Sequence, residues 1–291
     1  MELSHQSQLH SQRQLRYSIR TFAKLNLSLA VSPKRADGYH NIDSIFQTIS
    51  LHDTLTIEAI PDTSGVTISC NNTGLTKDNI ITTIYNDFAE SLDYGFHIDL
   101  HKQIPIGAGL GGGSSNAAGF LWVLSQFIPE LQAPDNRQRI SQKWGADIPF
   151  FVRGGTAHVT GIGEIITPVT PQEWTHYVMI YPNLHISSRD AYTWFDEDLA
   201  NGRYEAAALN HLKMPVIARY PQLRSIEIAL NNTGVTDVRM SGSGSTLFVP
   251  CMSSQEASRI QTDMTNAFPD YIIKTVTPVP YGFCHVSHHD D

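Results

Sequence analysis

Hydrophobic and polar positions alternate along residues 19–31, near the N-terminus. The apolar residues that share one parity are Ile19, Ala23, Leu25, Leu27, Leu29 and Val31. A period of two is typical of a half-buried strand, whose successive side chains point to opposite faces. Lys24 and Asn26 fall on the other face, together with Phe22. The pattern therefore predicts a strand that presents a lysine and an asparagine side by side.

Further along the chain, strand and helix periods succeed one another. Strands are predicted over residues 54–60, 66–69 and 96–100, and a hairpin over 157–166. Helical spacing of apolar residues predicts helices over 79–92, 117–127 and 137–144. In the last third, strands are expected over 177–181, 246–249 and 271–276, and helices over 209–218, 222–230 and 255–268.

These elements suggest a fold class and a division into domains. Strands and helices interleaved in two halves indicate an α+β fold and not a doubly wound parallel sheet. Two prolines within residues 167–174 mark a candidate boundary, so we expect an N-terminal domain over 15–167 and a C-terminal domain over 168–285. Residues 1–14, rich in Gln, Ser and His, and residues 286–291 are expected to be disordered tails.

The most informative segment is the run of residues 105–118, PIGAGLGGGSSNAA. Glycine permits positive φ and a close approach of the backbone to a bulky ligand. A glycine-rich loop that leads into a helix presents unpaired N–H groups and the positive end of the helix dipole, which together suit a phosphate. We expect Ser114 or Ser115 to cap that helix. A flexible linker is the alternative, but the apolar patterns on both sides argue against it.

Two well-known phosphate loops do not account for this run. A Walker loop would require Gly-Lys-Ser/Thr after the glycines, and none follows. A Rossmann fingerprint fits Gly107, Gly109 and Gly112 only weakly, because the run lies a third of the way along the chain. The strand with an acidic end that should follow a Rossmann loop is not apparent in residues 128–139.

The run closely resembles the second motif of the GHMP kinase superfamily, whose members cradle ATP phosphates on such a loop. Three further segments are similar to that superfamily: AKLNL at 23–27 with RADGYH at 35–40, GADIPFF at 145–151, and MSGSGST at 240–246. All of them lie in the family order between about residues 19 and 279. The resemblance implies an α+β fold of two domains with a deep cleft between them.

The pairing of AKLNL with RADGYH is similar to one branch of the superfamily only. That branch phosphorylates the 2-hydroxyl of a small cytidyl diphosphate, 4-diphosphocytidyl-2-C-methyl-D-erythritol, in non-mevalonate isoprenoid biosynthesis. The resemblance thus implies an ATP-dependent small-molecule kinase. Two other functions stay open: another GHMP kinase, acting on homoserine or mevalonate, and a nucleotide-binding module without catalysis.

The resemblance also assigns residues to ATP. Those implied to hold its phosphates are Pro105, Ile106, Gly107, Ala108, Gly109, Leu110, Gly111, Gly112, Gly113, Ser114 and Ser115. Ala108 stands where some relatives have glycine, a change that costs little if its φ is negative. Lys102 either approaches the adenine or ribose, or is a solvated lysine at the end of a strand. Mg²⁺ is expected because it bridges the phosphates in ATP chemistry, although no carboxylate cluster or other dedicated metal site is apparent.

Phosphoryl transfer requires positioning, charge neutralisation and a group that orients or deprotonates the attacking hydroxyl. The family resemblance gives that last role to Asp147 and a charge-stabilising role to Lys24. Taken without the resemblance, Asp147 would be a helix N-cap followed by a proline in the first turn. Lys24 would be an ordinary lysine at a strand edge.

The family resemblance further implies a substrate pocket. Tyr39 and His40, after the turn Asp37-Gly38, would bind cytosine by stacking and a polar contact, with Tyr192 as a second aromatic by rough alignment. Asn26 would hydrogen-bond the substrate diphosphate, and Gly242 would let the third motif pack beside the loop. The alternatives are surface residues for Tyr39, His40 and Asn26, and a plain turn for the third motif.

Composition limits the remaining possibilities. A formal net charge of −8 argues against a nucleic-acid-binding protein, and an acidic enzyme acting on ATP must concentrate positive charge locally. The three cysteines are far apart, without metal-ligand spacing, and favour a reducing cytoplasm over a disulfide framework. No apolar run approaches membrane-spanning length. We expect a cytoplasmic monomer or homodimer without nucleic-acid or membrane partners.

Overall fold

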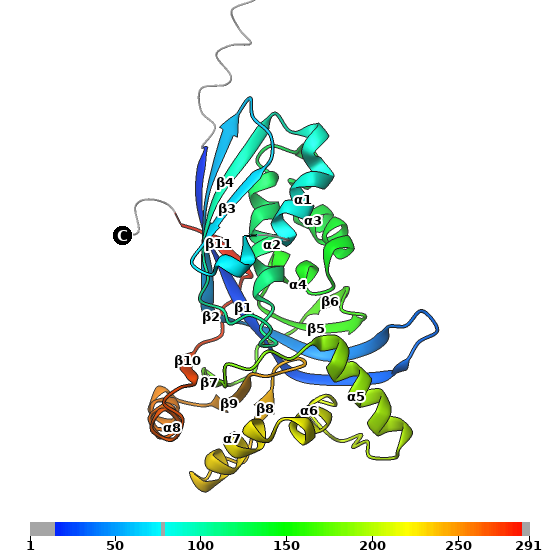
Figure 1. Ribbon diagram of the computed structural model, residues 1–291, viewed down its shortest axis with the longest axis vertical. Helices are drawn as coiled ribbons and strands as arrows, with labels where there is room; N and C mark the ends of the chain where they lie inside the picture. The colour runs from blue at the N-terminus through cyan, green and yellow to red at the C-terminus, as the bar shows by residue number, and fades with distance from the viewer. Residues whose placement is uncertain (1–14, 77–78, 287–291) are drawn as a thin grey trace, which may run out of the picture.

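The computed structural model describes residues 15–76 and 79–286, so the tail expected at 1–14 and all of the tail expected at 286–291 except Val286 lie outside the described residues. Two long strands, β1 (Arg16–Lys34) and β2 (His40–Pro61), pair antiparallel along most of their length. In Figure 1 this ribbon starts in one half of the molecule, runs past the sheet of the other half and ends in a projecting hairpin. The ribbon therefore belongs to both halves of the fold.

The first sheet has seven strands in the order β11-β1-β2-β4-β3, and β5 and β6 extend it from β2. The strands added to the ribbon are β3 (Val66–Cys70), β4 (Tyr94–His101), β5 (Thr156–Gly161), β6 (Ile165–Pro168) and β11 (Phe283–His285). β2 is long enough to pair with β4 along one half and with β5 along the other. Among the named strands of the described residues, only β3 and β4 pair in parallel, which confirms that the sheet is not doubly wound.

Four helices pack against one face of this sheet (Figure 1): α1 (Ile80–Phe88), α2 (Gly112–Leu124), α3 (Pro134–Ser141) and α4 (Ile148–Arg153). Short 3-10 turns lie at Thr73–Leu75, Ala89–Ser91, Pro129–Leu131 and Gln142–Trp144. The core between helices and sheet is aromatic, with Phe46, Phe96, Phe120, Phe150 and Phe151 almost fully buried. Burial of these rings fixes α2, and with it the end of the glycine loop.

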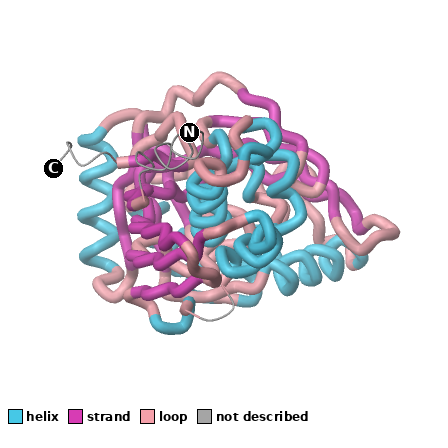
Figure 2. The backbone as a smooth tube through the Cα atoms, turned by 90° about the horizontal axis from the view of Figure 1, so that it is seen from above, coloured by secondary structure: helices cyan, strands magenta, loops and turns pink. Residues whose placement is uncertain are grey.

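The second half is a four-stranded antiparallel sheet in the order β10-β7-β9-β8. Its strands are β7 (His176–Tyr181), β8 (Arg239–Met240), β9 (Leu247–Cys251) and β10 (Ile272–Val276). Its helices are α5 (Ser188–Ala200), α6 (Lys213–Arg219), α7 (Pro221–Asn232) and α8 (Ser254–Ala267). Buried residues of all four helices share one core with Val178 and Ile180 of β7 and Leu247 and Val249 of β9, so the helices cover the same face of this sheet. Figure 2 shows the helices and strands of both halves from above, and the α+β class expected from the sequence is confirmed.

A third core joins the two sheets. Ala23, Leu25 and Leu27 of β1 pack with Tyr177 and Met179 of β7 and with residues of the glycine loop. The opposite face of β1 is buried as well, because Lys24 and Asn26 are only 4% and 3% exposed. The expectation of a half-buried strand was therefore wrong: the parity was right, but both faces are covered.

Three other details differ from the sequence-based expectations. Helix α2 begins earlier than predicted and its N-cap is Gly111, with φ of 71° and no side-chain cap, so neither Ser114 nor Ser115 caps it. β2 begins at His40, well before the predicted strand at 54. The segment of α5 and strand β11 carried no prediction. β11 pairs with β1, and the N–H of Val286 donates to Ser18, so the chain returns to the first sheet at its end.

Within the described residues, no helix is both long and apolar enough to cross a membrane.

One buried side chain of the third core gives a test of this packing. Tyr177 is fully buried, its hydroxyl has no hydrogen-bond partner among the described residues, and burial raises its pKa to about 12. An unsatisfied buried polar group costs about 1–3 kcal/mol. Tyr177→Phe is expected to leave the free energy of unfolding unchanged or to raise it by about 1 kcal/mol, measured by urea denaturation.

Tyr85→Phe is the matched control. The Tyr85 hydroxyl accepts a hydrogen bond from the N–H of Gly65 (2.8 Å) and donates one to the carbonyl of Tyr94 (3.2 Å). Its removal should lower stability by about 1 kcal/mol. A comparable loss in Tyr177→Phe would show that the Tyr177 hydroxyl has a partner, such as buried water.

Candidate active site

A cavity of about 970 Å³ opens between the ribbon, the glycine loop, α5 and residues 146–147, which precede α4. This volume lies at the upper end of the range usual for small-molecule sites. Its lining includes all of the predicted site residues except Ser115: Lys24, Asn26, Tyr39, His40, Lys102, Pro105, Ile106, Gly107, Ala108, Gly109, Leu110, Gly111, Gly112, Gly113, Ser114, Asp147, Tyr192 and Gly242. Segments from both ends of the sequence thus meet in one place.

The phosphate loop, residues 105–111, leads directly into α2. Gly107, Gly109 and Gly111 have φ of 63°, 77° and 71°, a region that other residues rarely adopt. The first N–H groups of α2 have no intrahelical acceptor, and Gly112, Gly113 and Ser114 line the cavity there. Ser115 is buried instead, and its hydroxyl donates to the carbonyl of Gly282 (3.4 Å).

The carbonyl groups of the loop are held from behind. Ala108, whose φ is not positive, accepts from the N–H of Thr246 at 3.3 Å. Gly109 accepts from the hydroxyl of Ser241 (2.8 Å), and Leu110 accepts from the N–H of Lys24 (3.0 Å). The third glycine-rich motif, residues 240–246, is therefore more than a plain turn, because it packs beside the phosphate loop as expected.

Lys24 and Asp147 meet at the centre of the cavity. The ammonium of Lys24 lies 3.7 Å from Oδ2 of Asp147, with the two side chains 5% and 33% exposed. It also donates to the amide oxygen of Asn26 and lies over the ring of Phe46. Asp147 does occupy the N-cap position of α4, but its side chain makes no capping hydrogen bond. The carboxylate is thus directed to Lys24, and the alternative of an edge lysine is wrong.

Burial lowers the pKa of Lys24 from its ordinary value of 10.5, whereas the charge and hydrogen bond of Asp147 act in the opposite direction. The charged form of this lysine therefore depends on the carboxylate beside it.

Asn26 and Gly242 complete this central group. The amide nitrogen of Asn26 donates to the hydroxyl of Ser44 (3.0 Å), which fixes its orientation. Gly242 has φ of 57°, and a Cβ there would lie 3.2 Å from Oδ1 of Asn26 and 3.6 Å from Nζ of Lys24. Asn26 is buried, so the alternative of an ordinary surface residue is wrong.

Aromatic residues line the cavity near the projecting hairpin. The rings of His40 and Tyr192 stack with centroids 4.9 Å apart and 30° between planes. Nε2 of His40 lies 2.8 Å from Oδ1 of Asp196, a residue the sequence did not suggest. Tyr39 is 60% exposed at the mouth. Burial, followed by the negative charge of Asp147, raises the pKa of Tyr192 to about 12.

Lys102 lines the other end of the cavity and is not a solvated lysine. Its side chain is only 8% exposed and its ammonium lies 2.5 Å from the fully buried carboxylate of Asp53. Near Lys102 the cavity lining also includes three apolar residues that the sequence did not suggest as site residues: Leu75, Ile80 and Leu100. Asp53 had no motif to mark it, because its partners are far away in the sequence.

The described residues contain no group of three or more His, Cys, Asp or Glu side chains that could hold a metal ion. Mg²⁺ commonly binds through one or two protein oxygens together with substrate phosphates and water. The hydroxyl of Ser114 and the carboxylate of Asp147 offer such oxygens in the cavity lining. These residues are compatible with a magnesium ion that arrives with a nucleotide.

Comparisons with known proteins agree with this geometry. Residues 79–155 match the family model "GHMP kinases N terminal domain" and residues 197–270 match "GHMP kinases C terminal". A 4-diphosphocytidyl-2-C-methyl-D-erythritol kinase of Lachnoclostridium phytofermentans is 33% identical over 287 residues, covering 91% of this chain and 94% of that protein. The chloroplastic kinase of the same name from Oryza sativa subsp. japonica is 36% identical over 247 residues, covering 77% of this chain and 62% of that protein.

Solved structures show the same relation. A crystal structure of 4-(cytidine 5'-diphospho)-2C-methyl-D-erythritol kinase superposes with a TM-score of 0.70 at 29% identity, covering 89% of this chain and 99% of the other. Homoserine kinase from Cytophaga hutchinsonii has a TM-score of 0.68 at 17% identity, covering 95% of this chain and 99% of the other, which shows a shared fold. The fold and the cavity are those of an ATP-dependent small-molecule kinase. The chain belongs to the 4-diphosphocytidyl-2-C-methyl-D-erythritol kinase family of the GHMP kinases.

The contact between the loop and the third motif can be tested at Gly109. A Cβ there would lie 2.1 Å from the carbonyl oxygen of Ser241, and its φ of 77° is unfavourable for alanine. Gly109→Ala should weaken ATP binding by tenfold or more and lower the melting temperature, because the loop must move away from the third motif. Calorimetric titration with ATP and thermal unfolding measure the two effects.

Gly113→Ala serves as the stability control, because a Cβ at Gly113 would meet no atom within 4 Å and its φ is not positive. This variant should keep or raise the melting temperature of the wild type, because Gly113 lies in α2 and alanine is a better helix former than glycine. Equal stability of the Gly109 and Gly113 variants would contradict the described contact.

The lowered pKa of Lys24 predicts a pH dependence of stability. At a pH between the pKa of Lys24 in the folded protein and 10.5, its value in the unfolded chain, the unfolded chain binds one more proton at this site than the folded chain. Stability of the wild type relative to Lys24→Met should therefore rise as pH increases towards 10.5. Urea denaturation of both proteins across an alkaline pH series measures this difference. A relative stability that falls over that series would mean that the pKa of Lys24 is raised.

Proposed function

We propose that this protein transfers the γ-phosphoryl group of ATP to the 2-hydroxyl of 4-diphosphocytidyl-2-C-methyl-D-erythritol. One observation carries the proposal: the Lys24–Asp147 pair lies in the same cavity as a phosphate loop and a stacked His40–Tyr192 pair. Such an arrangement suits a substrate that has an aromatic base at one end and a hydroxyl at the other. The names of the relatives that this chain matches contain the same substrate.

In the proposed reaction the protein mainly positions the two substrates and neutralises charge. Asp147, free of any capping bond, orients the attacking hydroxyl or accepts its proton. The ammonium of Lys24 stabilises the negative charge on the transferred phosphoryl group. Asn26, held by Ser44, contributes to binding the substrate diphosphate near the pair.

Recognition of cytosine is proposed for Tyr39, His40 and Tyr192. A carboxylate oxygen of Asp196 can only accept from Nε2 of His40, so Nε2 carries the hydrogen. In a neutral imidazole the Nδ1 atom is then an acceptor, which suits the exocyclic amino group of cytosine. Stacking of a base on an aromatic side chain contributes about 1–3 kcal/mol in nucleic-acid systems.

At the other end, ATP is proposed to place its adenine against Leu75, Ile80 and Leu100 and its phosphates on the phosphate loop. Mg²⁺ would be held by the phosphates with Ser114 and Asp147, and it would neutralise charge during transfer. We further propose a reducing compartment, the cytoplasm, because all three cysteines are free.

Phosphorus NMR tests the reaction directly. The purified protein is incubated with magnesium, ATP and 4-diphosphocytidyl-2-C-methyl-D-erythritol, beside parallel samples containing homoserine or mevalonate. A new phosphomonoester signal is expected only with the cytidyl substrate, together with ADP. Transfer to another alcohol instead would contradict the cytosine pocket, and ATP binding without transfer to any alcohol would favour a non-catalytic nucleotide-binding protein.

Asp147→Asn tests the mechanism in the same assay. Loss of the carboxylate should lower the turnover number by a factor on the order of 10²–10⁴, the usual contribution of general acid–base catalysis. Thermal unfolding checks that the variant is folded. Wild-type turnover in a folded Asp147→Asn protein would exclude the proposed role of this residue.

A further inference from the structure

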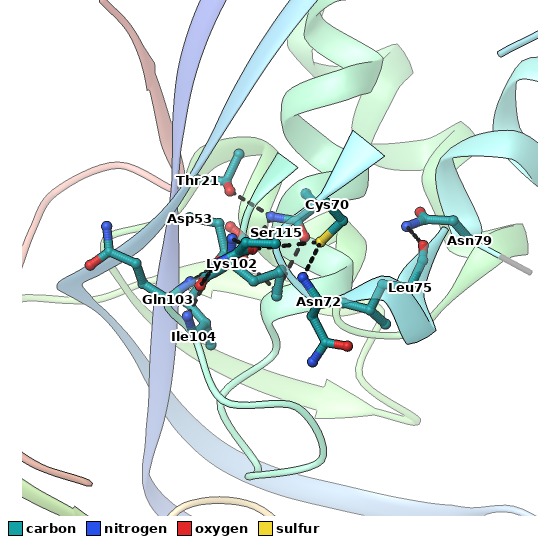
Figure 3. Close-up of polar contacts among 12 residues, drawn as sticks. Thr21, Asp53, Cys70, Asn72, Leu75, Asn79, Lys102, Gln103, Ile104 and Ser115 are labelled. Carbon is teal, nitrogen blue, oxygen red and sulfur yellow. Dashed lines mark hydrogen bonds and ion pairs between the residues drawn. The ribbon is translucent and has the colours of Figure 1, made fainter. Parts of the chain in front are cut away.

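Asp53 is a fully buried carboxylate that lies behind the phosphate loop, with no role in the chemistry described so far. Its Oδ1 atom accepts hydrogen bonds from the N–H groups of Gln103 and Ile104, both at 2.8 Å. Its Oδ2 atom accepts from the ammonium of Lys102 (2.5 Å) and from the amide of Asn116 (2.9 Å). Figure 3 shows this group where the segment that enters the loop passes β1 and β2.

These donors come from the segments that form the ATP end of the cavity. Residues 102–104 enter the phosphate loop, and Asn116 lies in α2, the helix that the loop begins. The amide of Asn116 also donates to the hydroxyl of Thr21 in β1 (2.7 Å). A buried carboxylate is costly unless every lone pair is used, so its four donors are held in one arrangement. Asp53 thereby fixes the loop entrance, the helix and the ribbon relative to one another.

Lys102 is the part of this group that reaches the ligand cavity. An ammonium has three N–H donors, of which Asp53 takes one and Oδ1 of Asn116 takes another at 3.3 Å. The ammonium lies 2.9 Å from where a Cβ of Gly112 would be, at the start of α2, and lines the cavity. One N–H of Lys102 is therefore available to a bound nucleotide.

We infer that Asp53 is a positioning residue for ATP: it holds Lys102 at the N-terminus of α2, so that the ammonium binds the nucleotide. Asp53 itself does not touch the ligand. The inference rests on the part of the proposed function that concerns ATP, and it is independent of which alcohol is phosphorylated. ATP binding measured without any alcohol therefore separates a failure of this inference from a failure of the proposed substrate.

The test is a double-mutant cycle on ATP binding, measured by calorimetric titration with magnesium and ATP. Lys102→Met removes the ammonium, and Asp53→Asn removes the charge that holds it. Each is expected to raise the dissociation constant of ATP by about tenfold, the effect of one lost hydrogen bond to a charged group. The variant D53N/K102M, in which no charge stays buried without a partner, should bind ATP as weakly as K102M, because both changes remove the same contact.

Stability gives a second, independent readout. Both single variants should unfold at lower temperature, whereas D53N/K102M should regain part of that loss, since an unpaired buried charge is the main cost. If Asp53→Asn does not fold, the comparison of K102M with D53N/K102M still tests the inference. Wild-type ATP affinity in folded K102M, or in the folded double variant, would overturn it, and so would a folded Asp53→Asn protein with wild-type ATP affinity.

Asp198→Asn is the matched control for a purely structural effect. Asp198 is a buried aspartate that pairs with Arg203 at 2.6 Å and does not line the cavity. Its substitution should lower the melting temperature and leave the dissociation constant of ATP unchanged. A similar loss of ATP affinity in this variant would mean that general destabilisation, and not the position of Lys102, explains the result at Asp53.

Discussion

A phosphate loop has to leave its N–H groups free for a ligand, and this constraint determines how the two halves of the molecule are joined. Because the N–H groups are reserved, the loop is held through its carbonyl oxygens, which accept from Lys24, Ser241 and Thr246. One of these donors lies in β1 and two lie in the third motif. The loop also supplies apolar residues to the core between the sheets. Its conformation is therefore a property of both halves together.

The charges of the cavity follow a similar principle. The chain is acidic overall, with a formal net charge of −8, although its proposed ligands are anions. Two lysines in the cavity, Lys24 and Lys102, are each buried beside one aspartate. A buried charge is costly without a partner, so each aspartate holds its lysine at a defined place. The difference lies in exposure: Asp147 faces the cavity, whereas Asp53 is enclosed.

Local patterns predicted a large part of this arrangement. The alternation in β1 placed Lys24 and Asn26 on one face, and the glycines of residues 105–113 located the loop, because both signals depend on neighbouring residues. Burial of the face that carries Lys24 and Asn26 was not predictable in this way, because the residues that lie against it, among them Asp147 and Gly242, come from distant parts of the chain. The N-cap of α2 was predicted wrongly because a serine is a favourable N-cap locally, whereas Gly111, in the left-handed conformation, already occupies that position. Asp53 lacked any local signal, since its donors include Asn116, 63 residues away.

Irregularities of the β1–β2 ribbon explain how these distant residues are brought together. The pairing is regular through Thr21 opposite Asp53 and Phe22 opposite His52, then shifts between Phe22 and Ala23, and shifts again between Asn26 and Ser28. Lys24 and Asn26 lie between the two shifts, and Asp53 lies beside the first. Such shifts bend a strand and redirect its side chains. In a ribbon without these shifts, the side chains on the face that carries Lys24 would all point to the same side along the whole strand. With them, the same strand can place Thr21 against α2 and Lys24 against the phosphate loop.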